Sequence, residues 1–187
     1  MTKQSVLVLV VLLIVATACS ALPGDEPGSI AMVPFSLPEM AIQGTVPSAC
    51  PQIEGGTFAC EALLPGEGLL VVSVSAAPVP REEMEDAVVQ SLGLDALPDA
   101  LGLYRGKALT WQVYRVDSEL KDQGVPPPAD GGLYRVEMAL ADSEGWTFLA
   151  AMITLPADRE AHAAFFDTLF KQMLYTLAPL LSERAPQ

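Results

Sequence analysis

Basic and aromatic residues are scarce in this sequence of 187 residues. Ten Lys and Arg stand against 23 Asp and Glu, which gives a formal net charge of −13, and only 6% of the residues are aromatic. Proteins that bind nucleic acid need clustered Lys and Arg against the phosphates, so we expect no nucleic-acid partner. The same charge disfavours docking on an anionic membrane through a basic face.

The residue patterns of several catalytic and metal sites are also absent. His162 is the only histidine, and with two distant cysteines it supplies too few ligands for a zinc site. No Gly-x-Ser-x-Gly elbow offers a nucleophilic serine, and neither the Gly-x-x-x-x-Gly-Lys-Ser/Thr loop nor a Gly-x-Gly-x-x-Gly turn after a strand is present. We therefore predict no catalytic residues, no metal and no cofactor, and interpret His162 as a surface or boundary residue.

What the sequence does contain at its start is a short apolar run. Lys3 precedes an unbroken apolar stretch over residues 6–16, and small residues follow it. A basic start, an apolar core and a small-residue exit are typical of a secretory signal. The strongly apolar part is about 11–13 residues, or roughly 16–20 Å as a helix, which is short of a ~30 Å hydrocarbon core. We predict a signal peptide over residues 1–18 rather than a permanent transmembrane anchor.

Two kinds of processing fit the end of this run. Ala16, Thr17 and Ala18 suit ordinary secretory cleavage, but with Cys19 they resemble the bacterial lipoprotein box, whose cysteine becomes the acylated first residue. That family most often has Leu where Ala16 stands. The cysteine count favours the lipoprotein, because an acylated Cys19 leaves an even pair. We predict that Cys19 is lipidated and that the lipid bilayer is its partner. Residues 19–29, which begin with this cysteine, are predicted to form a flexible tether. The protein would then lie on the extracytoplasmic face of the cell membrane.

Cys50 and Cys60 are the remaining cysteines, and they flank a predicted hairpin. In an exported protein such a pair is expected to form a disulfide. Closing a loop of about 11 residues would stabilise the fold by roughly 2.5–3 kcal/mol. A redox-active pair is the alternative, although such pairs usually have Cys-x-x-Cys spacing at a helix start.

Hydrophobic periodicity predicts one domain over residues 30–181, followed by a tail over 182–187. Period-two alternation and β-branched runs predict strands over 40–46, 57–62, 69–76, 109–116, 133–141 and Trp146–Thr154. Apolar stripes predict helices from Pro80 to about Leu92 and from Pro156 to about Leu181. The predicted fold class is α+β, with a mostly antiparallel sheet, one inserted helix and a long C-terminal helix packed on the sheet.

Two hairpins are predicted within this sheet. Strand 40–46 is expected to pair with strand 57–62 across a glycine turn, and strand 133–141 with Trp146–Thr154 across a tight polar link. In strand 133–141 the alternation places a core-facing set at Tyr134, Val136, Met138 and Leu140, and an outward set at Arg135 and Glu137.

Three further features have alternative interpretations. Four pairs of acids lie close together in the sequence: Glu82/Glu83, Glu85/Asp86, Asp117/Glu119 and Asp142/Glu144. Roles in turns and helix caps explain them. A carboxylate hydrolase, the alternative, would need two of these acids to converge in one cleft. Five aromatic residues could form a binding platform: Tyr104, Trp111, Tyr114, Tyr134 and Trp146. Packing in the core and between strands explains them better. The long loop over residues 117–132 is the best remaining candidate for an interaction element.

Four segments resemble a domain that is found in some bacterial exported proteins and beside some serine-hydrolase domains: residues 35–47, 92–98, 109–114 and 139–149. The order of their strands and helices is similar to the PsbP-like fold of lipoproteins and photosystem accessory subunits. The related pattern tends to have Trp where Cys50 stands, and no hydrolase domain accompanies the module, so no catalytic residue is carried over. We expect a membrane-anchored lipoprotein acting as a non-enzymatic binding or accessory module, with a membrane or cell-wall protein as a candidate partner. The alternative is a small exported hydrolase that uses paired carboxylates.

Overall fold

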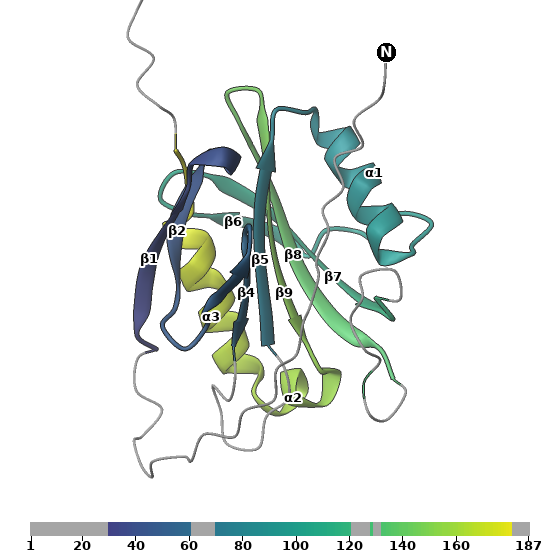
Figure 1. The fold of residues 1–187 in the computed structure, drawn as a ribbon. Coiled ribbons are helices and arrows are strands. Elements are labelled where there is room, and N and C mark those ends of the chain that lie inside the picture. The colour runs from purple at the N-terminus through teal and green to yellow at the C-terminus, as the bar shows by residue number, and fades with distance from the viewer. Residues whose placement is uncertain (1–29, 61–69, 121–127, 129–131, 181–187) are drawn as a thin grey trace, which may run out of the picture.

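The computed structural model describes residues 30–60, 70–120, 128 and 132–180. Its architecture is α+β: the described strands pair antiparallel, and helices cover both faces of the larger sheet (Figure 1). Among the described residues no helix combines the length and the apolar character needed to cross a membrane. The predicted signal peptide, tether and C-terminal tail lie outside the described residues.

Seven strands form the larger sheet. Their spatial order is β3 (Gln52–Glu54), β4 (Thr57–Cys60), β5 (Leu70–Ala77), β9 (Trp146–Thr154), β8 (Tyr134–Ser143), β7 (Thr110–Ser118) and β6 (Gly102–Arg105). The strands predicted over 69–76, 109–116 and 133–141 are confirmed to within two residues at each end. The short edge strand β6 was not predicted, because it is mostly exposed and begins at a glycine, so its sequence shows no clear alternation.

The predicted hairpin of β8 and β9 is confirmed, and its turn explains its register. Ser143 pairs with Trp146, so Glu144 and Gly145 alone make the turn. Both residues have a positive φ, of 50° and 79°, as the type I′ turn of a two-residue hairpin requires. This turn fixes which side chains of the two central strands share a face.

A separate three-stranded sheet lies beside the larger one (Figure 1). Its order is β1 (Met32–Leu37), β2 (Ile42–Pro47) and β10 (Ala178–Pro179). One turn of 3-10 helix, Pro38–Met40, joins β1 to β2, and Ala41 completes the turn in the left-handed region with a φ of 49°.

The predicted hairpin between strands 40–46 and 57–62 is wrong. Strand β2 pairs with β1 and β10, whereas β4 pairs with β3 and β5. Met40 and Ala41 fit the alternating pattern but form the turn that enters β2. Gly56 lies at the turn between β3 and β4, where a Cβ would be 1.8 Å from the carbonyl oxygen of Val74 on β5. Only glycine permits that close approach of two backbones.

Helix α3 (Ala163–Thr176) packs on one face of the larger sheet and α1 (Arg81–Leu92) on the other (Figure 1). Helix α1 buries Met84 and Val88, two positions of the stripe predicted for it. The core on the α3 side is built from large side chains that are almost wholly buried, among them Ile42, Trp111, Phe148, Met152, Leu169, Met173 and Leu174.

Burial on both faces overturns one prediction for β8. The four residues predicted to face the core are buried on the α1 side. Glu137, predicted to face outward, is only 4% exposed and meets Arg159 of helix α2 (Pro156–Ala161). The alternation separates the two faces of the strand correctly, but it does not show that the second face is covered as well.

The single C-terminal helix predicted from Pro156 to about Leu181 is also wrong. His162, with φ −123° and ψ 37°, separates α2 from α3. Helix α3 ends at Thr176, after which the extended Leu177 directs the chain into β10 beside β2. Pro179 contributes to this ending, because proline disfavours helical backbone in the residue before it.

Candidate functional site

The outward face of the small sheet carries uncharged side chains. Ser36 pairs with Gln43 and Pro34 with Thr45, while Ala178 of β10 pairs with Gln43, so these five residues share one face. The residues that alternate with them on β2 are turned toward the core, where Ile42 and Val46 are buried. We call the surface formed by Pro34, Ser36, Gln43, Thr45 and Ala178 the uncharged face.

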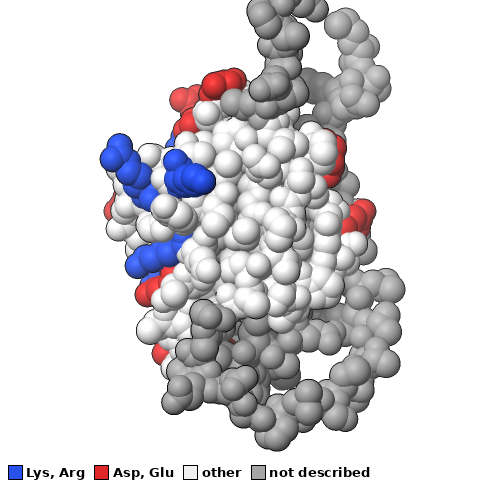
Figure 2. All heavy atoms as spheres, turned by 90° about the vertical axis from the view of Figure 1, so that its left-hand side faces the viewer, with Lys and Arg blue, Asp and Glu red and all other residues white. Residues whose placement is uncertain are grey.

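The lack of charge extends over the whole sheet. Between Ile30 and Ile53 the only charged residue is Glu39, although the complete chain has 23 acids. Strand β10 holds no charged residue either. Figure 2 shows this side of the molecule as a broad surface without Lys, Arg, Asp or Glu, with charged side chains along its rim. Apart from Glu39 in the turn between β1 and β2, the acids of the described residues therefore lie outside the small sheet and its connection.

A groove of about 440 Å³ lies in the uncharged face, and four of the five residues of that face line it. Residues of β1 and β2 and the end of α3 line it, together with Lys107 and Ala108. Thr45 fixes one wall, because its N–H donates to the Thr176 hydroxyl at 3.1 Å and the two hydroxyl oxygens are 2.9 Å apart. Gly44 lets α3 come close, since a Cβ there would be 2.7 Å from Cδ2 of Leu177.

Arg105, Lys107 and Lys171 form a basic rim next to this groove. The N–H of Lys107 donates to the carbonyl of Tyr175 at 2.9 Å, and Lys171 lies one turn before Tyr175 on α3. All three cationic side chains are exposed, and within the described residues none of them is in an ion pair. The remaining described cations are all in ion pairs: Arg81, Arg115, Arg135 and Arg159. Figure 2 shows Lys and Arg side chains gathered along one side of the uncharged surface.

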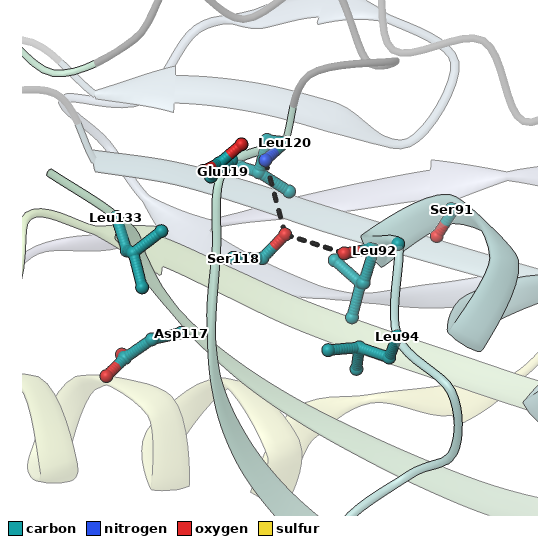
Figure 3. A pocket seen from close by; sticks show the side chains of 9 residues that line it. Ser91, Leu92, Leu94, Asp117, Ser118, Glu119, Leu120 and Leu133 are labelled. Atoms are coloured by element: carbon teal, nitrogen blue, oxygen red, sulfur yellow. Dashed lines mark hydrogen bonds between the residues drawn. The ribbon is translucent and has the colours of Figure 1, made fainter. Parts of the chain in front are cut away.

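A second cavity, of about 320 Å³, lies between the C-terminal end of α1 and the end of β7 (Figure 3). Its central hydroxyl, Ser118 Oγ, donates to the Leu92 carbonyl at 2.9 Å and accepts from the Leu120 N–H at 3.2 Å. Asp117 on its wall is paired with Arg135. These contacts attach α1 to the sheet, so Ser118 has a structural role here. Most of the predicted interaction loop that continues from this wall lies outside the described residues.

Several of the acids predicted as pairs, and Glu137, contact arginines. Glu85 and Asp142 both accept from Arg81, at 2.8 and 2.9 Å. Glu137 accepts two bonds of 2.8 Å from Arg159, which also contacts Asp167. These arrangements lend the hydrolase alternative no support, because glycosidase carboxylates face each other across a substrate cleft.

The charge environment of Arg159 fits a structural role. Burial alone would lower the pKa of Arg159, but its hydrogen bond to Glu137 and the charges of Glu137 and Asp167 raise that pKa above its ordinary value. The guanidinium also lies over the Phe166 ring, 5.9 Å from the centroid. Arg159 is thus held as a cation that joins α2 and α3 to the sheet.

The predicted site residues have different outcomes. Cys50 and Cys60 are joined by a disulfide, and both are buried beside the β3–β4 hairpin that they flank. Cys19 lies outside the described residues. His162 is exposed at the break between α2 and α3. In the part of the chain that the structure describes, no group of three or more His, Cys, Asp or Glu is placed to hold a metal ion.

The aromatic residues serve mainly as core. Trp111 is fully buried, and Tyr114 and Tyr134 are each 4% exposed. Trp111 Nε1 donates to the Leu174 carbonyl at 3.0 Å, so its polar edge is used within the fold. The uncharged face and the basic rim were not predicted, although one signal was available: a long segment with a single charge in a strongly acidic chain.

No protein-family model matches this sequence, and no curated protein sequence does. Among solved structures, the cyanobacterial PsbP (CyanoP) of Synechocystis has a TM-score of 0.46 at 9% identity, over 84% of this chain and 97% of that chain. The Ran-binding protein Mog1p of Saccharomyces cerevisiae has a TM-score of 0.48 at 11% identity, over 81% and 97%. LpqN, described as involved in cell envelope biogenesis of Mycobacterium tuberculosis, has a TM-score of 0.46 at 9% identity, over 81% and 92%.

These likenesses concern the arrangement of strands and helices. A PsbP protein is among them, which agrees with the resemblance noted from the sequence. All three TM-scores lie below 0.5 and the identities near one residue in ten, so none of these proteins lends its function to this chain.

Proposed function

We propose that this protein is an exported lipoprotein, anchored through an acylated Cys19, whose α+β domain is a non-enzymatic binding module. The proposal rests on one observation: two of the three cysteines are bonded to each other and the third is not part of that bond. Cys50 and Cys60 are bonded to each other, which leaves Cys19 as the single remaining thiol, directly after an apolar run and small residues. A structural disulfide favours an oxidising compartment outside the cytoplasm.

The anchor follows from the chemistry of such a cysteine. Stable membrane attachment takes more than one acyl chain, since each buried CH₂ contributes about 0.8 kcal/mol and a single chain binds only reversibly. A lipoprotein cysteine carries several acyl chains and therefore places the domain on the extracytoplasmic face of the cell membrane.

We assign the ligand site of this module to the groove in the uncharged face. Its walls are uncharged apart from Lys107, and they are held by the paired hydroxyls of Thr45 and Thr176. A concave site with few polar groups on a rigid support is typical of ligand binding. Glu85 and Asp142 share Arg81, and Glu137 and Asp167 share Arg159, which suits a structural role for these acids better than acid–base chemistry.

Acyl labelling tests the anchor directly. The full chain is expressed in a bacterium that is fed an alkyne-bearing fatty acid, beside Cys19→Ser and the neighbouring control Ser20→Ala. We expect the label on the wild type and on Ser20→Ala, with both in the membrane fraction until detergent is added, and no label on Cys19→Ser. An unlabelled wild type, or equal labelling of Cys19→Ser, would refute the proposal.

A further inference from the structure

The uncharged face and its basic rim have an electrostatic meaning for a domain tethered to a membrane. Bacterial and other cytoplasmic membranes contain anionic lipids, and a chain with a formal charge of −13 is repelled by them on average. Repulsion acts within about one Debye length, roughly 8–10 Å at ordinary ionic strength. The side that can approach most closely is therefore the small sheet, whose strands carry no carboxylate among the described residues (Figure 2).

The basic rim adds attraction at the edge of the same side. Lys107 lines the groove in the uncharged face, Arg105 lies two residues before it at the end of β6, and Lys171 lies one turn before Tyr175, whose carbonyl accepts from the Lys107 N–H. Within the described residues these are the cations that no carboxylate neutralises, so their charge is available to lipid phosphates. Tyr175, whose carbonyl accepts from the Lys107 N–H, is 52% exposed and offers an amphipathic ring of the kind found at membrane surfaces.

The tether brings this side to the bilayer. Eleven residue steps separate Cys19 from Ile30, which is two residues before β1 begins. A fully extended chain spans at most about 3.3–3.6 Å per residue, so an acylated Cys19 keeps Ile30 within roughly 40 Å of the lipid surface. Strand β1 supplies two of the residues of the uncharged face.

We propose that the anchored domain lies with its uncharged face on the lipid headgroups and its basic rim against the phosphates of anionic lipids, so that the groove in this face meets lipid headgroups as its ligand. The five side chains of this face are small or polar, without large apolar groups, so the contact is made at headgroup level and the sheet does not enter the hydrocarbon. The net charge disfavours docking through a broadly basic face. Such a face is not needed, because the three cations of the basic rim, together with the lack of acids on the described strands of the small sheet, set the orientation. This inference rests on the proposed anchor at Cys19.

The test measures orientation with the acylated full-length mature protein in lipid vesicles. Cys50 and Cys60 are bonded and Cys19 carries lipid, so a cysteine introduced by Ser36→Cys on the uncharged face is the single thiol open to a fluorophore. Glu82→Cys, exposed on α1 across the larger sheet, is the matched control position. In vesicles containing anionic lipid and a headgroup-attached quencher, we expect quenching at position 36 to exceed that at position 82 by at least about twofold.

A charge-matched pair of variants tests the basic rim. The first variant loses the three positive charges of the rim through Arg105→Gln/Lys107→Gln/Lys171→Gln. The second gains three negative charges at exposed positions on or just after α1 through Ala87→Glu/Gln90→Glu/Ala96→Glu. We expect the first variant to lose most of the difference between positions 36 and 82, and the second to keep it. Raising the salt from about 0.1 to about 1 M shortens the Debye length from roughly 10 to 3 Å and should shrink the difference in the wild type.

The outcomes separate this inference from the anchor. Protein that fails to float with the vesicles overturns the anchor and the orientation together. Protein that floats with equal quenching at positions 36 and 82 overturns the orientation alone. Protection of position 36 in native membranes without quenching in pure lipid vesicles also overturns it, because a protein partner then covers the face.

Discussion

At the scale of single residues, Glu137 shows how this fold uses charge. Its carboxylate is 4% exposed and accepts hydrogen bonds from Arg159, which is itself 3% exposed, and from Arg115. A buried pair of this kind often contributes little net stability, because both ions lose their hydration, but removing Arg159 leaves the buried Glu137 carboxylate with only the partly exposed Arg115 against it. The pair therefore stabilises one particular docking of α2 against β8 more than it stabilises the fold as a whole.

Removing one member of this pair should cost more than removing both. We expect Arg159→Met to lower the free energy of unfolding by about 3–5 kcal/mol, and Glu137→Leu/Arg159→Met to recover a large part of that loss. Urea denaturation measures both. Arg135→Gln is the control, because its partner Asp117 is exposed, and it should cost less than about 1 kcal/mol. A double variant as unstable as the sum of its two single variants would contradict this account.

Tyr134 should make stability depend on pH in the alkaline range. Burial raises the pKa of its phenol above the ordinary value of about 10. The folded state then keeps the proton at a pH where the unfolded chain has lost it. This contribution is fully present below about pH 10 and is lost as the pH rises through the folded pKa.

The measurement is urea denaturation at about pH 8 and pH 11. We expect Tyr134→Phe to reduce the alkaline loss of stability seen in the wild type. Tyr175→Phe, which changes a tyrosine that is 52% exposed, should leave that loss unchanged. An equally steep loss in Tyr134→Phe and the wild type would show that this phenol is not involved.

At the scale of elements, Trp111 joins strand β7 to the end of helix α3. It is fully buried, and its indole N–H satisfies the Leu174 carbonyl near the C-terminus of the helix. Gly106 permits this contact, because a Cβ there would be 2.6 Å from the same carbonyl oxygen and 3.2 Å from the indole nitrogen.

Trp111→Phe keeps most of the apolar bulk but leaves the carbonyl of Leu174 buried without its donor. We expect a loss of about 1–3 kcal/mol for the unsatisfied group, in addition to the effect of the smaller ring. Trp146→Phe, at a partly buried tryptophan, is the control and should cost less. Thermal or urea unfolding measures the loss of stability in each variant. Equal losses for the two substitutions would contradict a stabilising role of the indole N–H.

The Cys50–Cys60 disulfide fixes the β3–β4 hairpin at the edge of the larger sheet. Replacing both cysteines by alanine should lower the free energy of unfolding by roughly 2.5–3 kcal/mol, through the freedom regained by the unfolded chain. Reduction of the wild type should give a loss of similar size. No change in stability on reduction would show that the bridge does not constrain the unfolded state.

The sequence predicts some elements well and others poorly, for physical reasons. The β8–β9 hairpin follows from alternation and a two-residue turn, both of which are local. Strand β10 depends on β2, more than 130 residues earlier, and its two residues carry no pattern of their own. The break at His162 and the burial of Glu137 likewise depend on packing between distant elements, which period analysis does not contain.

At the scale of the whole molecule, charge is distributed unevenly over a strongly acidic chain. The strands of the small sheet are uncharged, and the described cations that form no ion pair with a described residue lie toward its edge (Figure 2). The sequence shows this in the segment between Ile30 and Ile53, whose single charged residue is Glu39. The site itself was not predictable, because the groove forms only where β2, the end of α3 and Lys107 meet in space.

The most direct test of the central claim is the intact mass of the protein isolated from membranes, before and after reduction. We predict a chain that begins at residue 19, with 187 − 18 = 169 residues, whose mass exceeds that of the polypeptide by a lipid group. Reduction should add two hydrogens, one for each sulfur of the Cys50–Cys60 bridge. A mass equal to the unmodified chain from Met1, unchanged on reduction, would contradict export, anchor and disulfide together.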